Sequence, residues 1–463
     1  MDKYKITIGL EIHVALKTTS KLFSRSACDF SSEQFSMFDA AIPGFLPVLS
    51  DKPAELAIRF ALSVGADIPK FSIFERKHYF YPDSPLGYQI TQQHNPIMIG
   101  GKVPITLDGK KIEVIIEHAH LECDAAKSLH DKFSGYTAID LARGSSPLLE
   151  IVTTPCIHSP QEAKLYAQTV CELVKYLDIC DGKLEEGSFR VDASISLSKT
   201  EVLGTRVEIK NISSFSFLEA ALEYEIERQA ELLDSGESIV METRLLNESS
   251  LTTHSMRKKE SVHEYRYMPD PDIPPLVLEE GFIQKVADSC DIYYFKRKDE
   301  LQSLFDSLEI KQANVEIILL SKYKETWLRL LKEPVKDLEK FVKILAFWIP
   351  DVIAKQEETK ILSFEDVLFL SESTLQAKEC KETISSFLFS DKSIKECVPV
   401  SMSDDDVIDI IKSVLLEYPK QVEDYKSGQE KLIQFLIGKT MSKTKGKASA
   451  VLVKDLFEKE ISK

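Results

Sequence analysis

The sequence has few of the features that mark a secreted or membrane-bound protein. Its 463 residues include only eight cysteines, and no two of them have the spacing of a zinc knuckle or a disulfide framework, so we expect reduced thiols. No apolar run approaches the ~20 residues of a membrane span, and no basic-then-apolar signal sequence is present. We therefore expect a cytoplasmic protein with no membrane partner.

The sequence also has fewer positive than negative charges. Lys and Arg total 58 against 74 Asp and Glu, which gives a net charge of −16. This balance argues against nonspecific coating of nucleic acid, but it allows a folded RNA to bind through local basic patches. A P-loop is missing as well, because Gly438–Thr440 lacks the upstream glycine of that motif and follows an expected helix rather than a strand.

The hydrophobic pattern changes along the chain. Short alternating runs up to about Leu278 predict strands, whereas long Leu-, Ile-, Lys- and Glu-rich stretches beyond Gly281 predict helices. Between them, Pro269–Pro275 predicts an extended connector, because each proline biases its predecessor away from helix. We therefore expect an α+β protein with a mostly antiparallel-sheet domain at 1–280, an all-α domain at 281–398 and a small helical tail at 399–463.

Two helices are predicted inside the strand-rich part. Ser159 and Glu162 form a capping box with a proline at the first helical position, and a helical apolar stripe follows. Ser216 and Glu219 repeat the box, and Gly236 is expected to end that second helix.

Four strand-like runs each place polar side chains on one face. In the first run, apolar residues from Ile6 to Val14 alternate with Gly9, Glu11 and His13. The other runs lie at 115–122, 189–197 and 205–211, and a turn with two carboxylates precedes the third. Their polar residues in phase are His118, His120 and Glu122; Arg190, Asp192, Ser194 and Ser196; Arg206, Glu208 and Lys210; and, in the turn, Glu185 and Glu186.

Several interpretations fit these runs. An antiparallel sheet with one solvated face would show the pattern without any function. The mixture of imidazoles, carboxylates and cations instead favours a sheet floor for nucleotide chemistry, where carboxylates hold Mg²⁺ and cations neutralise phosphate. A metal-dependent hydrolase built on His118, His120 and Asp192 is a second possibility, and an RNA-binding scaffold is a third.

Aromatic and basic residues interleave in Glu75–Asp83 and in Tyr265–Pro269. Such segments could stack on a base or on the terminal adenosine of a tRNA, but a core strand entered from a basic turn would look the same. The loop Gly438–Lys447 carries four lysines, which suit either a solvated connection or contact with a phosphate backbone. These lysines are Lys439, Lys443, Lys445 and Lys447.

These motifs, in this order, resemble the B subunits of the Asp/Glu-tRNA amidotransferases, the GatB/GatE family. The resemblance covers nearly the whole chain and is weakest in the middle helical part. The segments that carry it are Gly9–His13, Arg76–Asp83, Gly87–Ile90, Pro147–Val152, Glu185–Asp192, Val207–Asn211, Tyr265–Tyr267, Asp424–Gly428 and Phe435–Gly438.

The resemblance implies a carbon–nitrogen ligase that uses glutamine as amido donor. The family's B subunit has a cradle domain that binds misacylated Glu-tRNA(Gln) or Asp-tRNA(Asn) and phosphorylates the side-chain carboxylate with ATP and Mg²⁺. Ammonia from an amidase-type A subunit then displaces the phosphate, and a small C subunit completes the heterotrimer.

The resemblance also implies roles for individual residues. The implied catalytic residues are Glu11, His13, Glu150, Asp192 and Lys210. The implied binding residues for ATP or the aminoacyl group are Lys77, Tyr79, Glu186, Ser188, Arg190 and Glu208. The implied metal ligands are Glu11, His13, Glu122, Asp124 and Glu150, and the four tail lysines would bind tRNA.

The chain departs from the family pattern near this site. Members usually read Glu-Glu-Asp-Ala-Gly where this chain has Glu122, Cys123 and, for the glycine, Ala126; Ala142 replaces an asparagine further on. The second glutamate of that motif is an expected Mg²⁺ ligand, and a thiol is a poor substitute. Two alternatives follow: a working site in which Glu122 or Asp124 supplies oxygen, or a divergent subunit with weakened catalysis that acts mainly as a tRNA-binding scaffold.

Overall fold

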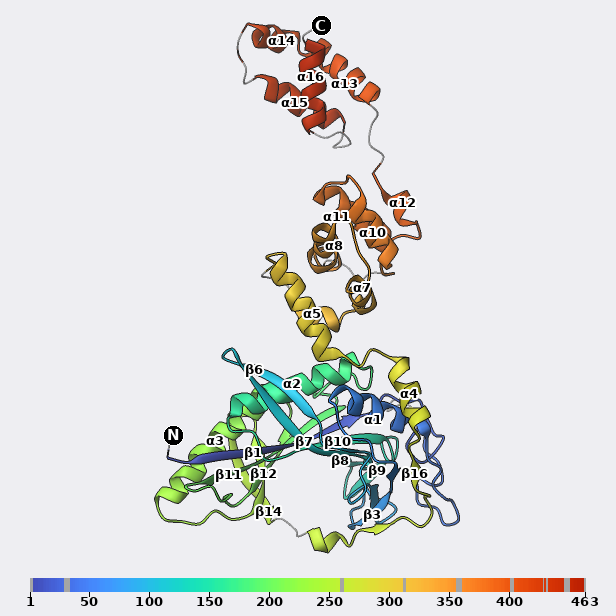
Figure 1. Ribbon diagram of the computed structural model, residues 1–463, viewed down its shortest axis with the longest axis vertical. Coiled ribbons are helices and arrows are strands. Elements are labelled where there is room, and N and C mark those ends of the chain that lie inside the picture. The colour runs from blue at the N-terminus through green and yellow to red at the C-terminus, as the bar shows by residue number, and fades with distance from the viewer. Residues whose placement is uncertain are drawn as a thin grey trace. The chain divides into compact units, whose positions relative to one another are not determined.

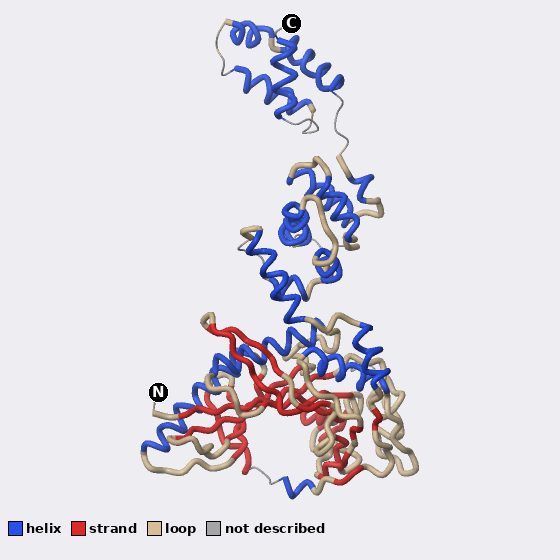
Figure 2. The backbone as a smooth tube through the Cα atoms, in the orientation of Figure 1, coloured by secondary structure: helices blue, strands red, loops and turns tan. Residues whose placement is uncertain are grey.

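The computed structural model describes residues 3–28, 34–258, 262–310, 314–354, 360–399, 404–427, 429, 432–444 and 450–461. The chain divides into two compact units. The first unit comprises residues 1–303 and 315–320, and the second comprises residues 304–314 and 321–463. Among the described residues, the strands all lie in the first unit (Figures 1 and 2). The predicted α+β class is confirmed, whereas the bounds of the three predicted domains stay predictions.

A nine-stranded sheet forms the floor of the first unit, in the order β14-β13-β12-β11-β1-β10-β7-β5 with β6 paired to β7. The central strand β1 (Lys5–Ala15) is antiparallel to both neighbours, β11 (Phe189–Ser198) and β10 (Pro147–Thr153). The other strands are β5 (Met98–Ile99), β6 (Lys102–Leu107), β7 (Lys110–Cys123), β12 (Val207–Ile212), β13 (Glu242–Asn247) and β14 (Thr252–Lys258). Only β12 and β13 run parallel within the described part of this sheet.

Helices cover the apolar face of this sheet. α2 (Pro160–Tyr176) and α3 (Phe215–Asp234) pack against each other and contact β1 and β11, and α1 (Asp51–Ser63) contacts β5 and β7 (Figure 1). The alternation predicted for the first strand is confirmed, because Ile8, Leu10, Ile12 and Val14 are all 1% exposed or less.

The helix starts were predicted with mixed success. Ser159 caps α2 as predicted, and its hydroxyl accepts a hydrogen bond from the Glu162 amide at 3.2 Å. The prediction for α3 was wrong by two residues, since Ser214 is the N-cap and accepts from the Phe217 amide at 3.1 Å. Ser214 has the extended backbone that an N-cap requires, whereas Ser216 already lies in the first helical turn.

A second, smaller sheet brings the two aromatic segments together. Its order is β15-β3-β4, formed by β15 (Met268–Pro269), β3 (Glu75–His78) and β4 (Tyr88–Thr91). The remaining pieces of this part are β2 (Phe71–Ser72) paired with β16 (Leu276–Val277), the hairpin of β8 (Lys127–Phe133) and β9 (Tyr136–Asp140), and the short helix η1 (Val262–Tyr265).

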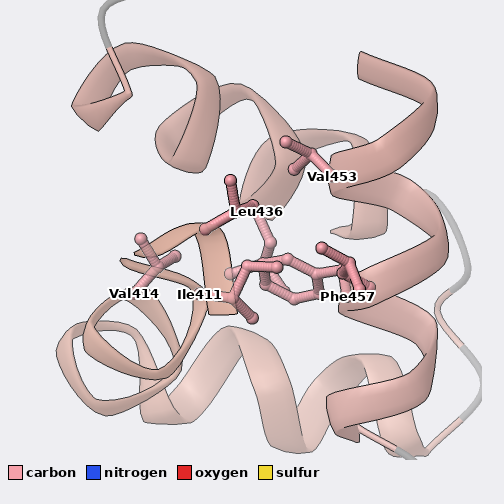
Figure 3. Close-up of a cluster of buried hydrophobic side chains, with 7 residues drawn as sticks. Ile411, Val414, Leu436, Val453 and Phe457 are labelled. Atoms are coloured by element: carbon pink, nitrogen blue, oxygen red, sulfur yellow. The ribbon is translucent and has the colours of Figure 1, made fainter. Parts of the chain in front are cut away.

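The rest of the described chain is helical. The helices before the tail are α4 (Glu280–Ser289), α5 (Tyr294–Ser307), α6 (Val315–Leu319), α7 (Lys324–Leu330), α8 (Leu338–Lys343), η2 (Ile344–Trp348), α9 (Ile349–Ile353), α10 (Phe364–Glu372), α11 (Ala377–Leu388) and α12 (Ile394–Cys397). The tail consists of α13 (Asp404–Glu417), α14 (Pro419–Lys426), α15 (Leu432–Lys443) and α16 (Ala450–Ile461). It has a small core of its own that includes Ile411, Leu436 and Phe457 (Figure 3). None of the described helices has the length and apolar character needed to cross a membrane.

Candidate active site on the polar face of the sheet

The register of the sheet places polar residues from neighbouring strands side by side. His13 on β1 lies opposite Glu150 on β10, and Glu150 lies opposite His120 on β7. On the other side of β1, Glu11 lies opposite Asp192 on β11. Paired residues share a face of the sheet, so residues predicted from separate strands form one continuous polar surface opposite the helices.

One half of this surface, which we term the histidine half, consists of His13, His120, Glu122 and Glu150. His13 Nε2 lies 3.3 Å from Glu150 Oε2 and 3.7 Å from Glu122 Oε1. His120 Nε2 lies 3.3 Å from the same Glu150 oxygen. His120 was predicted as a site residue only for the hydrolase alternative, from its position in phase with Glu122, and was not among the residues that the resemblance implied.

The charges of the histidine half depend on one another. Burial disfavours the imidazolium form, but Glu150 and Glu122 outweigh it and raise the pKa of His13 to about 9 and that of His120 to about 10. Burial also opposes ionisation of Glu150, yet the two imidazolium groups hold its pKa well below the usual range. Both histidines and Glu150 are therefore charged at neutral pH.

The other half, which we term the lysine half, consists of Glu11, Asp192, Glu208 and Lys210. Lys210 Nζ lies 2.6 Å from Asp192 Oδ2 and 3.2 Å from Glu208 Oε1. Burial, together with Glu150 and Glu208, raises the pKa of Glu11. One lysine thus faces three carboxylates, whose ligand oxygens lie within 4.8 Å of one another. Such an oxygen set with excess negative charge fits a hard divalent cation.

A cavity of about 220 Å³ adjoins the lysine half. Glu11 and Ser194 line it from the sheet, and Arg206 lines it from the entrance to β12. The charged residues of its lining are Arg206 and the acidic residues Glu11 and Glu117. The cavity leaves room for a ligand next to the polar face.

The structure brings Asp124, a predicted metal ligand, to neither half. Its Oδ2 accepts a hydrogen bond from Arg143 Nε at 2.5 Å, and its Oδ1 accepts from Arg190 Nη2 at 3.0 Å. Arg143 Nη2 also donates to the Gly187 carbonyl at 2.8 Å. The carboxylate of Asp124 therefore engages two guanidinium groups and ties the end of β7 to the turn before β11.

Two further predicted binding residues lie in that turn and make local contacts. Glu186 Oε1 accepts from Lys183 Nζ at 2.7 Å, and its side chain is largely exposed. The Ser188 hydroxyl donates to Asp181. Neither side chain belongs to the histidine half or the lysine half as the structure arranges them, so their binding roles stay predictions.

Two tyrosines that flank strands of the smaller sheet, Tyr79 after β3 and Tyr267 before β15, lie close to the histidine half. Burial raises the pKa of Tyr79 and of Tyr267, and carboxylates of this half raise both further, Glu122 for Tyr79 and Glu150 for Tyr267. The predicted Lys77 places its Nζ 4.9 Å from the ring centre of Tyr265. Tyr267 belongs to the segment Tyr265–Pro269, which was predicted to stack on a base or to form a core strand, but it was not named as a site residue. Its proximity depends on the pairing of β15 with β3, which no local pattern encodes.

The departures from the family pattern leave both halves intact. Cys123 follows Glu122 on β7 and therefore points to the opposite face of the strand, where it is 8% exposed. Burial and nearby Asp39 raise the pKa of its thiol well above the usual value. Ala126 adopts a negative φ, as expected for a residue that replaces glycine, and its amide donates to the Asp83 carbonyl at 2.9 Å.

The predicted tRNA-binding lysines of the tail make contacts within the tail. Lys443 Nζ pairs with Glu417 and donates to Ser413 Oγ at 3.1 Å. Lys439 Nζ lies 5.3 Å from the ring centre of Phe435. Lys445 and Lys447 lie outside the described residues. The predicted loop was wrong over residues 438–443, which lie in α15. Binding of tRNA by these lysines stays a prediction.

Known protein families and individual proteins match almost the whole chain. Residues 6–284 match the GatB/GatE catalytic domain, and residues 354–461 match the GatB domain. A Legionella pneumophila protein named as the B subunit of an aspartyl/glutamyl-tRNA(Asn/Gln) amidotransferase is 38% identical over 484 residues, which cover 99% of this chain and 100% of the relative. Proteins of the same name from Paraburkholderia phytofirmans and Thermodesulfovibrio yellowstonii are 39% and 38% identical, with 99% of each chain covered.

Proposed function

The chain belongs to the GatB/GatE family of Asp/Glu-tRNA amidotransferase B subunits, and we propose that its polar sheet face activates the side-chain carboxylate of a misacylated tRNA by phosphorylation with ATP. As a family member it is a subunit of a glutamine-dependent ligase that takes part in translation. The proposed substrates are Glu-tRNA(Gln), Asp-tRNA(Asn) or both. Ammonia from an amidase-type A subunit would displace the phosphate, and a small C subunit would complete the heterotrimer.

The observation that carries this proposal is the pair of carboxylate clusters on either side of β1. Glu11, Asp192 and Glu208 of the lysine half would hold Mg²⁺, since all three supply the oxygen ligands that this ion prefers. A bound Mg²⁺ neutralises charge on phosphate oxygens during transfer. Asp124 is left out of the proposed ligand set, because two arginines occupy its carboxylate.

The histidine half would act differently from the lysine half. While His13 and His120 are protonated, they present positive charge to an anionic substrate beside Glu150. His13, Glu122 and Glu150 could also hold a cation, but the imidazole must first lose its proton. An imidazole is a less suitable Mg²⁺ ligand than a carboxylate, so we assign the Mg²⁺ primarily to the lysine half.

The aminoacyl end of the tRNA would enter beside the smaller sheet. Tyr79 and Tyr267 approach the carboxylates of the histidine half, and Lys77 stands over a neighbouring ring. Aromatic faces suit the unpaired bases of a tRNA terminus. Lys77, which lies close to the ring of Tyr265, would attract the phosphates of the tRNA terminus.

A divergent scaffold that binds tRNA without catalysis has less support. The argument for this alternative was that Cys123 replaces a Mg²⁺ ligand. The Cys123 side chain, however, lies on the face of β7 opposite Glu122. The carboxylates Glu11, Glu122, Glu150, Asp192 and Glu208 are all present on the polar face.

The test is amidation by the complex reconstituted with A and C subunits. Glutamine and ATP should convert Glu-tRNA(Gln), Asp-tRNA(Asn) or both to the amidated forms, and omission of ATP should abolish conversion. Hydrolysis that requires a bound metal but no ATP would support the metal-dependent hydrolase instead. No turnover with normal tRNA binding would support the scaffold.

A further inference from the structure

A buried ion pair lies apart from the two halves of the polar face. Lys21 is 0% exposed, and its Nζ lies 3.6 Å from Asp39 Oδ2. Burial lowers the pKa of Lys21, while Asp39 acts in the opposite direction. Removing two charges from water costs several kcal/mol for each ion, and a pair of apolar side chains often stabilises a fold equally well. The pair therefore calls for an explanation other than stability.

The ammonium group of Lys21 holds a turn. Its Nζ donates to the Leu141 carbonyl at 3.0 Å, and the same carbonyl accepts the Gly144 amide at 3.1 Å, which closes the turn 141–144. The next residue, Ser145, has a φ of +65°, a left-handed conformation that a non-glycine residue adopts only with support from its surroundings. Lys21 thus braces a turn that has little intrinsic preference for its shape.

Asp39 fixes the position of the lysine. Its Oδ2 accepts from Ser24 Oγ at 3.0 Å and from the Ser36 amide at 2.7 Å. Its Oδ1 is buried without a hydrogen-bond partner in the described structure. Lys21 lies 3.6 Å from Oδ2, so its charge compensates the buried carboxylate as a whole rather than pairing with Oδ1.

The braced turn carries Arg143. The guanidinium of Arg143 bonds both Asp124 and the Gly187 carbonyl, and Asp124 in turn holds Arg190. Arg190 lies opposite His13 in the register of β11 and β1. Contacts therefore run from the buried lysine through the turn to the edge of the histidine half.

We propose that the Lys21–Asp39 pair positions Arg143, and through Arg143 the Asp124–Arg190 contact at the edge of the proposed phosphorylation site. This inference rests on the proposed function for its effect on catalysis. Lys21 and Asp39 touch no substrate in this account, so they are positioning residues rather than catalytic ones.

A double-mutant cycle tests the catalytic part in the reconstituted complex. Lys21→Met and Arg143→Gln are compared singly and together by kcat for amidation at saturating ATP. Each single variant should lower kcat at least about tenfold, and the double variant should match Arg143→Gln alone, because both changes interrupt one path. Independent losses that multiply in the double variant would overturn the proposal.

A second variant distinguishes an effect on catalysis from a simple loss of folding. Lys21→Met with Asp39→Asn removes both charges and keeps an amide oxygen that can accept from Ser24 Oγ and the Ser36 amide. The melting temperature should therefore change little, whereas kcat should still fall about tenfold. Wild-type kcat in this variant would contradict the proposal.

Hydrogen–deuterium exchange separates this inference from the proposed function, because it needs no turnover. In the same full-chain variant, the Gly144 amide should exchange at least about tenfold faster than in wild type, while amides of β1 should not change. Unchanged exchange at Gly144 would contradict the inference. An inactive wild-type complex whose variant still shows the faster exchange would contradict only the proposed function.

Discussion

The two halves of the polar face balance buried carboxylates with different cations. In the lysine half, Lys210 pairs with Asp192 and Glu208. In the histidine half, His13 and His120 flank Glu150. A lysine so paired keeps its proton at any physiological pH, since burial opposes its charge but the carboxylates raise its pKa further. The imidazoles lose theirs as pH rises through about 9 to 10. Of the two halves, only the histidine half can therefore exchange protons for a metal ion at alkaline pH.

The largest expected effect comes from Glu11, which shares the polar face of β1 with His13 and lies opposite Asp192 on β11. Glu11→Gln removes one carboxylate from the proposed Mg²⁺ set, and we expect kcat for amidation to fall by about 10³. Glu113→Gln is a matched control, because Glu113 is exposed on β7 and pairs with exposed Lys102. Its kcat should stay within about twofold of wild type. A loss below about tenfold for Glu11→Gln would remove Glu11 from the site.

Lys210→Met should make the stability of the protein depend on a divalent cation bound at the lysine half. Without the ammonium group, three close carboxylates repel one another. We therefore expect a loss of about 2 kcal/mol in the free energy of unfolding. This loss is smaller than that for a fully buried pair, because the Lys210 side chain is 33% exposed and solvent screens its charge. Urea denaturation with and without Mg²⁺ measures this loss. Mg²⁺ should restore most of it, and Lys102→Met should show neither effect. A variant indifferent to Mg²⁺ would argue against a cation site in this half.

The histidine half should give the metal-free protein a pH-dependent stability. The pKa values of His13 and His120 are raised to about 9 and about 10 from a usual 6.5. Their contribution is therefore complete below about pH 6.5 and is lost as pH rises through 9 to 10, by on the order of several kcal/mol. Denaturation midpoints between pH 6.5 and 10 should show this decline. It should be much smaller in His13→Asn with His120→Asn, and an equal decline in that variant would contradict the charge assignment.

The smallest effect is expected for Cys123→Ser. Because Cys123 faces away from both halves, the change should leave kcat and its Mg²⁺ dependence within about twofold of wild type. A large shift in the Mg²⁺ requirement would place residue 123 at the metal after all.

Local patterns predicted much of this site. The two-residue period of a strand was enough to put Glu11 and His13 on one face and Ile8 and Leu10 in the core. The resemblance to the family supplied Glu150, which no period singles out.

Long-range partners were beyond sequence reasoning. Asp124 seemed available for metal, but arginines 19 and 66 residues away in the chain occupy it. Tyr267 reaches the site only through strand pairing. At the start of α3, Ser214 and Ser216 are both acceptable caps, and only packing decides between them.

Phosphoryl transfer tests the central claim most directly. ATP labelled in its γ-phosphate would be mixed with Glu-tRNA(Gln) or Asp-tRNA(Asn) and the reconstituted complex without glutamine, so that the activated carboxylate accumulates. We predict labelled aminoacyl-tRNA in a single turnover with wild type and with Glu113→Gln, and none with Glu11→Gln. Normal tRNA binding without any labelled product from wild type, or equal labelling by Glu11→Gln, would contradict the account.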